Sequence, residues 1–124
     1  MVAKSEENNP MAQKSILNDK PKNLIKKYYQ ILVNEGLPVE KIILFGSYAK
    51  GNPKPFSDLD LCVVSKKFGK NGYDEMVFLK KLTTQVDSMI EPHPYHPQDL
   101  KEKWDPLACE IRKHGITFKF RPST

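Results

Sequence analysis

Two short apolar segments, joined by a loop rich in glycine and proline, most constrain what this chain can fold into. Residues 41–45 are Lys-Ile-Ile-Leu-Phe and stop at Gly46-Ser47, and residues 59–64 are Leu-Asp-Leu-Cys-Val-Val. Branched and aromatic residues of this kind favour β-strands. The stretch 52–55, Asn-Pro-Lys-Pro, enforces a loop between them. The pattern therefore predicts two strands with a turn directly after the first.

Four segments carry the signals of helices. The first is expected to have its cap at Asp19 and Pro21 in its first turn, and to end at Gly36. Its apolar residues recur at helical spacing and its lysines occupy the opposite side. The other helices, in chain order, are predicted over residues 47–51, 74–86 and 106–114, the last with Gly115 as its C-cap.

The remaining extended segments complete a mixed α+β pattern. In residues 89–95 the prolines at 92 and 94 favour an edge or strand-end position. Ile116, Phe118 and Phe120 alternate with polar residues, which predicts either a terminal strand or an apolar docking tail. Helices and strands alternate along the chain, and this order predicts an α+β fold, a small mixed β-sheet with helices packed on it.

The length and the polar N-terminus bound the domain. A chain of 124 residues fits one domain. Residues 1–19 are polar and lack a sustained apolar period, so we expect a flexible tail there, the domain over 20–120, and a C-terminal tail over 121–124.

The charge and cysteine content narrow the class of partner and the compartment. The net charge of +5 favours anionic partners such as nucleotides, nucleic acid or an acidic protein face, or is simply that of a lysine-rich surface. Nucleic acid stays open as a partner but is not specifically indicated, because no arginine-rich run is present. The two cysteines, Cys62 and Cys109, cannot form a disulfide framework. No signal peptide or membrane span is recognisable, so we expect a cytoplasmic protein with no membrane partner.

The chemistry is concentrated in the segment from Phe45 to Leu61. Asp58 and Asp60 are two residues apart at a strand, so their side chains are expected on one face, while Leu59 points to the core. Two close carboxylates repel each other, and a divalent cation relieves that repulsion. Oxygen ligands of this kind suit Mg²⁺, which holds one or two protein carboxylates and completes its shell with water and phosphates.

Gly46 and Ser47 are predicted to form a phosphate cradle. Gly46 has no Cβ, so a phosphate can approach its backbone. A helix starting at Ser47 would aim free N–H groups at the same anion, and the serine hydroxyl adds a donor. Lys50 either reaches a phosphate or stays solvated.

The sequence Gly-Ser-Tyr-Ala-Lys-Gly followed by Ser-Asp-Leu-Asp-Leu resembles the nucleotidyltransferase superfamily that includes DNA polymerase β and kanamycin nucleotidyltransferase. It is most similar to the minimal nucleotidyltransferases of prokaryotes, which are often encoded beside a helical HEPN-type partner as a toxin–antitoxin pair. The resemblance covers roughly residues 22–116, and its specific part is 45–61. Many members carry arginine at the position of Lys50.

The resemblance implies the catalytic residues and the reaction. Family enzymes use a third carboxylate, for which Glu91 is the best match because the residue before Pro92 is held extended; Asp87 is the alternative. Asp58, Asp60 and Glu91 would then bind two Mg²⁺ ions, and Glu91 would take the proton of the acceptor. A hydroxyl would attack the α-phosphate of ATP, with pyrophosphate leaving.

Two functions from different classes follow from the resemblance. The first is a Mg²⁺-dependent nucleotidyltransferase that moves AMP from ATP to a hydroxyl on a partner protein, a small molecule or an RNA end. The second is an antitoxin-like module that masks a HEPN-type toxin with little or no turnover. The sequence leaves open whether the chain forms a homo-oligomer. His93 and His96 lie among prolines and are expected to line the acceptor side or to be structural rather than to bind zinc.

Overall fold

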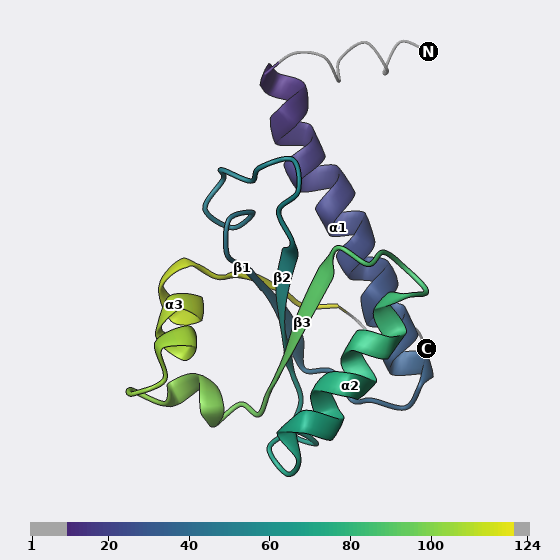
Figure 1. Ribbon diagram of the computed structural model, residues 1–124, viewed down its shortest axis with the longest axis vertical. Helices are drawn as coiled ribbons and strands as arrows, with labels where there is room; N and C mark the ends of the chain where they lie inside the picture. Colours follow the sequence, from purple (N-terminus) through teal and green to yellow (C-terminus); the bar gives the residue numbers. More distant parts are fainter. Residues whose placement is uncertain (1–9, 121–124) are drawn as a thin grey trace.

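A four-stranded sheet forms the centre of the computed structural model, which describes residues 10–120, with side chains from residue 20 onward (Figure 1). Its order is β3-β2-β1-β4, and the strands are β1 (Lys41–Phe45), β2 (Leu59–Val64), β3 (Ile90–Tyr95) and β4 (Ile116–Phe118). β1 pairs antiparallel with both β2 and β4, whereas β2 and β3 are parallel. The predicted mixed sheet is confirmed, and the segment with two prolines is an edge strand.

Three α-helices pack on the sheet within the described residues: α1 (Pro10–Asn34), α2 (Gly72–Thr83) and α3 (Pro106–His114), with a short 3₁₀ helix, η2 (Asp99–Lys101), before α3. Figure 1 shows α1 and α2 to the right of the strands and α3 to the left. The α+β fold class predicted from the order of elements is confirmed.

The alternation of side chains along the strands divides the core into two layers. Ile42, Leu44 and Leu61 face α1 and α2, where Tyr28 is fully buried and donates its hydroxyl to the Leu79 carbonyl oxygen at 2.7 Å. On the other face, a smaller group packs against α3 and η2, namely Ile43, Phe45, Cys62, Val64, Tyr95, Leu100, Ala108 and Ile111. One end of that face stays open, because the side chains of Asp60 and Glu91 there are 27% and 39% exposed.

The start of the first helix differs from the prediction. α1 begins at Pro10, so Asp19 is not its cap and Pro21 lies inside it. A proline inside a helix removes one hydrogen bond and costs about 3 kcal/mol, which the burial of Pro21 on the core side helps to offset. Asp19 and Pro21 together resemble the start of a helix, but in this chain the helix continues through both residues. The rest of the predicted tails, residues 1–9 and 121–124, lies outside the described residues.

The later elements follow the prediction closely. α1 ends before Gly36, and α3 has the predicted bounds because Asp105 caps it, its carboxylate accepting the N–H groups of Leu107 and Ala108. α2 begins at Gly72 after an Asn71 cap and ends at Thr83, and turns replace its predicted last residues.

The C-terminal segment resolves as a strand rather than a free docking tail. β4 covers the outer edge of β1, and the ring of Phe120 stacks on Tyr29 with the centroids 4.5 Å apart. The alternating residues thus close an edge of the protein's own sheet. Among the described residues, none of the helices combines the length and the apolar character that crossing a bilayer needs.

Candidate functional site

The two aspartates lie at the start of β2, on the open end of the α3 face. Asp58 directly precedes the strand and is exposed, and Asp60 is its second residue, with 27% of its side chain exposed. Cys62 and Val64 belong to the core group under α3, so the alternation of the strand places Asp60 on that same face. Leu59 and Leu61 are fully buried on the other face, as predicted.

Gly46 touches the carboxylate of Asp60. Phe45 pairs with Asp60 across β1 and β2, and the turn begins at the next residue. A Cβ built on Gly46 would lie 2.3 Å from Oδ2 of Asp60, and Gly46 has φ of 77°. Both the left-handed backbone and the contact require glycine here. The turn and the aspartate strand are therefore physically adjacent, which their separation in sequence does not guarantee.

The turn after β1 is not a helix. Residues 46–51 form hydrogen-bonded turns in which Lys50 N–H donates to the Gly46 carbonyl at 3.1 Å and Asn52 N–H donates to that of Ser47 at 3.1 Å. The predicted helix over 47–51 is wrong, because Asn52-Pro53 leaves it no room to continue. Within the described chain, the N–H groups of Ser47 and Tyr48 donate to no backbone carbonyl, so donors remain at the turn without a helix.

Lys50 points to α3. Its ammonium group lies 3.0 Å from the Glu110 carboxylate, with side-chain exposures of 44% and 31%. The contact of Lys50 with a phosphate stays a prediction. An ion pair at this exposure is weak, on the order of 1 kcal/mol or less. This contact ties the turn to α3.

Glu91 is the partner of Asp60 in the parallel pair of β2 and β3. Its Oε1 lies 3.1 Å from the Lys80 ammonium group, which also donates to the Ile90 carbonyl at 3.1 Å. Asp87 instead lies in the turn before β3, where its Oδ1 accepts the N–H of Met89 at 2.9 Å. Of the two predicted third carboxylates, only Glu91 is on a strand next to Asp60.

The two histidines have different surroundings. His93 follows Glu91 on the same face of β3, with its Nε2 3.9 Å from Oδ1 of Asp60 and its ring 5.2 Å from that of Phe45. His96 lies beyond the strand, where its Nδ1 accepts the Gln98 N–H. His93 therefore borders the carboxylates and His96 shapes a turn.

The Cys62 thiol and the Tyr95 hydroxyl, which are buried farther along this face, both stay protonated at neutral pH. Burial raises the pKa of the Cys62 thiol to about 12, against a smaller opposing effect of Lys41. Burial, together with the hydrogen bond to Asp105, also raises the pKa of Tyr95 above its usual range. A protonated buried thiol is a poor nucleophile, so Cys62 is not a candidate nucleophile of this site.

The oxygen donors at this end suit a hard cation shared with a ligand. Within residues 20–120, no group of three or more His, Cys, Asp and Glu side chains is arranged to hold a metal by itself. Mg²⁺ rarely uses such a protein cage and takes one or two carboxylates together with phosphate oxygens. Asp58 and Asp60, beside a turn with free N–H groups, fit that chemistry.

Two contacts of the site, Lys80 with Glu91 and Lys50 with Glu110, could not be predicted from the sequence. Lys80 is one of many lysines and lies ten residues before Ile90, yet it fixes Glu91. Glu110 lies sixty residues after Lys50. Both pairs form between elements that only the tertiary fold brings together.

Comparison with known proteins agrees with this geometry. The sequence model of the family described as "Nucleotidyltransferase domain" matches residues 25–106. A candidate protein adenylyltransferase of Methanocaldococcus jannaschii is 37% identical in an alignment of 75 residues that covers 56% of this chain and 51% of the relative, so the chain spans about half the length of that protein.

Among solved structures, a variant of the MntA–HpeT toxin–antitoxin complex superposes with a TM-score of 0.51 at 21% identity, over 75% of this chain and 69% of the other. This likeness shows the fold. The sequence match covers the Gly46-Ser47 turn, both aspartates and Glu91. The chain therefore belongs to the nucleotidyltransferase domain family, as the turn and the paired aspartates predict.

Proposed function

We propose that this protein transfers AMP from the magnesium complex of ATP to a hydroxyl group of a partner protein. The observation that carries the proposal is the contact between Gly46 and the Asp60 carboxylate, which brings together the turn proposed to bind phosphate and the strand proposed to bind the metal. The family assignment supports the reaction class. The name of the M. jannaschii relative supports adenylyl as the group and protein as the acceptor.

On the nucleotide side, the free N–H groups of the turn and the Ser47 hydroxyl would donate to the triphosphate. Gly46 lets the anion approach the backbone, and Asp58 and Asp60 are the residues that would hold Mg²⁺. What bound Mg²⁺ supplies is neutralisation of the phosphate charge and alignment of the attacking and leaving oxygens. Lys50 would exchange Glu110 for a phosphate at small cost, because its ion pair is exposed.

On the acceptor side, Glu91 would receive the proton. The acceptor oxygen forms a bond to the α-phosphorus, the bond from that phosphorus to the bridging oxygen breaks, and pyrophosphate leaves with the bond electrons. The acceptor proton passes to the Glu91 carboxylate, which Lys80 holds beside Asp60. Positioning and electrostatic stabilisation would supply most of the rate gain.

A protein acceptor is also supported by the surface. Phe56, Tyr73 and Trp104 are 96%, 78% and 86% exposed. Large exposed aromatic residues are frequent in protein interfaces. The similar fold of MntA, which is solved as a toxin–antitoxin complex, supports a protein partner in the same way.

The test compares ATP labelled at the α-phosphate with ATP labelled at the γ-phosphate. The purified protein, Mg²⁺ and the product of the neighbouring gene are incubated with each nucleotide. We expect acid-stable label on the partner from the α-labelled ATP alone, with one pyrophosphate released per transfer. Label from the γ-phosphate would indicate a kinase, and stable complex formation without any label would favour the antitoxin-like binding module.

The choice of Glu91 over Asp87 as the third carboxylate can be tested separately. We expect Glu91→Gln to lower the transfer rate by roughly 10²-fold, because the proton acceptor is lost. Asp87→Asn is the matched control, since an amide oxygen still accepts the Met89 N–H, and its rate should stay within about twofold of wild type. Single-turnover transfer rates for both variants decide the point. A larger loss in the Asp87 variant would reverse the assignment.

Lys80 is expected to act as a positioning residue through Glu91. Lys80→Met removes its bonds to Glu91 and the Ile90 carbonyl, and we expect a roughly tenfold lower rate and a higher magnesium requirement, as for other groups that orient a metal-binding carboxylate. Lys81→Met, on the exposed side of the same helix, is the control. Magnesium titrations of the initial rate distinguish the two. Equal behaviour of the variants would show that the Lys80–Glu91 pair has no role in transfer.

A further inference from the structure

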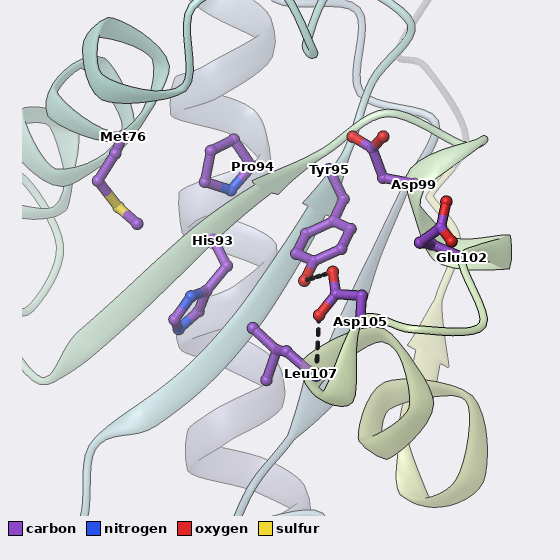
Figure 2. Close-up of a pocket in the computed structure, with 8 residues that line it drawn as sticks. All are labelled: Met76, His93, Pro94, Tyr95, Asp99, Glu102, Asp105 and Leu107. Atoms are coloured by element: carbon purple, nitrogen blue, oxygen red, sulfur yellow. Dashed lines mark hydrogen bonds between the residues drawn. The ribbon is translucent and has the colours of Figure 1, made fainter.

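A pocket of about 350 Å³ lies on the α3 face of β3, beyond the candidate site (Figure 2). Its floor is β3, and its walls come from α2 on one side and, on the other, from η2, the start of α3 and the segment between them. The lining residues are Met76, His93, Pro94, Tyr95, Asp99, Glu102, Asp105 and Leu107. None of them was singled out as a nucleotide ligand.

His93 connects this pocket to the carboxylates. It is a lining residue, and its Nε2 lies 3.9 Å from Oδ1 of Asp60. Glu91 precedes it by two residues on the same face of the strand. A molecule in the pocket would therefore extend past His93 to the point where the proton acceptor and the α-phosphate are proposed to meet.

The charge of the pocket is opposite to that of the protein. The chain carries a net charge of +5, yet the charged side chains of the lining are three carboxylates, and no lysine or arginine is among the lining residues. Asp105 is committed to the fold, because Oδ2 accepts the Tyr95 hydroxyl and Oδ1 caps α3. Asp99 and Glu102 are exposed at the opening. Arg112 donates to the Glu102 carbonyl nearby, but the side chains that line the pocket themselves favour a cation over a triphosphate.

The apolar part of the lining adds a size and shape requirement. Met76, Pro94 and Leu107 stand around His93, as Figure 2 shows. Such a wall suits the methylene stem of a lysine or arginine, or an aromatic ring, and the carboxylates at the mouth suit the charged end. A basic polypeptide segment satisfies both parts of the lining.

We propose that this pocket is the acceptor subsite and that it selects a polypeptide segment carrying lysine or arginine close to its acceptor hydroxyl. The basic side chain pairs with Asp99 and Glu102, and the hydroxyl side chain passes His93 toward Glu91 and Asp60. The assignment rests on the proposed transfer to a protein, and it adds the chemistry by which the acceptor is chosen.

The test measures peptide binding independently of transfer. Fluorescein-labelled peptides Gly-Arg-Ala-Tyr-Ala-Arg-Gly and Gly-Glu-Ala-Tyr-Ala-Glu-Gly are titrated with the full chain and followed by anisotropy. We expect saturable binding of the arginine peptide alone. In the double variant Asp99→Asn with Glu102→Gln, its Kd should rise about threefold to tenfold, the contribution of two exposed ion pairs. The amide introduced at position 99 keeps an oxygen that can accept the His96 N–H, so the loop is retained.

Controls separate this inference from the proposed function. Glu35→Gln, an exposed carboxylate after α1, should leave the Kd unchanged. Charge-selective binding without transfer of α-label would contradict the proposed function and leave the subsite in place. Equal binding of the two peptides, the same Kd in the double variant, or no saturable binding would overturn the subsite. Full displacement of the arginine peptide by an amino sugar at equal concentration would assign the pocket to small hydroxyl amines instead.

Discussion

Asp60→Asn is expected to lower the rate of AMP transfer by roughly 10²–10³-fold, with the fold intact. The substitution keeps the shape of the side chain and removes the charge that faces Gly46 and His93. A partly exposed carboxylate that lies 3.9 Å from the His93 Nε2 contributes little to stability, so the free energy of unfolding should hardly change. The rate is measured with α-labelled ATP, and stability by urea unfolding.

The matched control for Asp60 is Asp74→Asn. Asp74 is an exposed aspartate in the first turn of α2, remote from the paired strands in sequence and element. We expect its variant to transfer AMP within about twofold of wild type, since an exposed charge away from the reacting atoms contributes little. Comparable losses in both variants would mean that the charge at position 60 has no particular role.

Gly46→Ala is expected to abolish most of the activity and to destabilise the fold more than Gly51→Ala. Both glycines have positive φ, 77° and 79°, so each substitution costs about 1–2 kcal/mol of backbone strain. Only at position 46 does the new Cβ meet another group, 2.3 Å from Oδ2 of Asp60, whereas nothing lies within 4 Å at Gly51. Comparing the two variants therefore distinguishes the effect of backbone strain, which both share, from the effect of displacing the Asp60 carboxylate, which only Gly46→Ala causes.

The readouts for the glycine pair are the free energy of unfolding and the transfer rate of the folded fraction. Gly51→Ala should lose stability and keep its rate within about twofold, because its added Cβ meets nothing within 4 Å and leaves the Asp60 carboxylate in place. Gly46→Ala should lose both. If the two variants retained equal rates, the contact between the turn and Asp60 would not matter for the reaction.

The parts of the fold that were predicted correctly are those specified by local sequence. The strands 41–45 and 59–64 have the predicted bounds, because apolar β-formers are flanked by glycine, proline and charged residues. The helix 106–114 also matches, since its proline start and basic last turn are local signals. The predicted start of α1 and the predicted helix over 47–51 were wrong, because proline and glycine in these segments permit more than one local structure.

The site was predictable up to the point where strands pair. The spacing of Asp58 and Asp60 predicts a shared face, and the proline after Glu91 predicts an extended backbone. The parallel register that aligns Glu91 with Asp60 is a property of the assembled sheet. The contacts of Lys80 with Glu91 and of His93 with Asp60 depend on that register, so no local pattern indicates them.

The most direct test is a calorimetric titration of ATP into the full chain, with and without Mg²⁺. We expect saturable binding that requires Mg²⁺ and is lost in both Asp58→Asn and Asp60→Asn, because the two carboxylates are proposed to hold the metal and the turn to hold the phosphates. Binding of ATP that is equally strong without magnesium, or unchanged in the two variants, would contradict it.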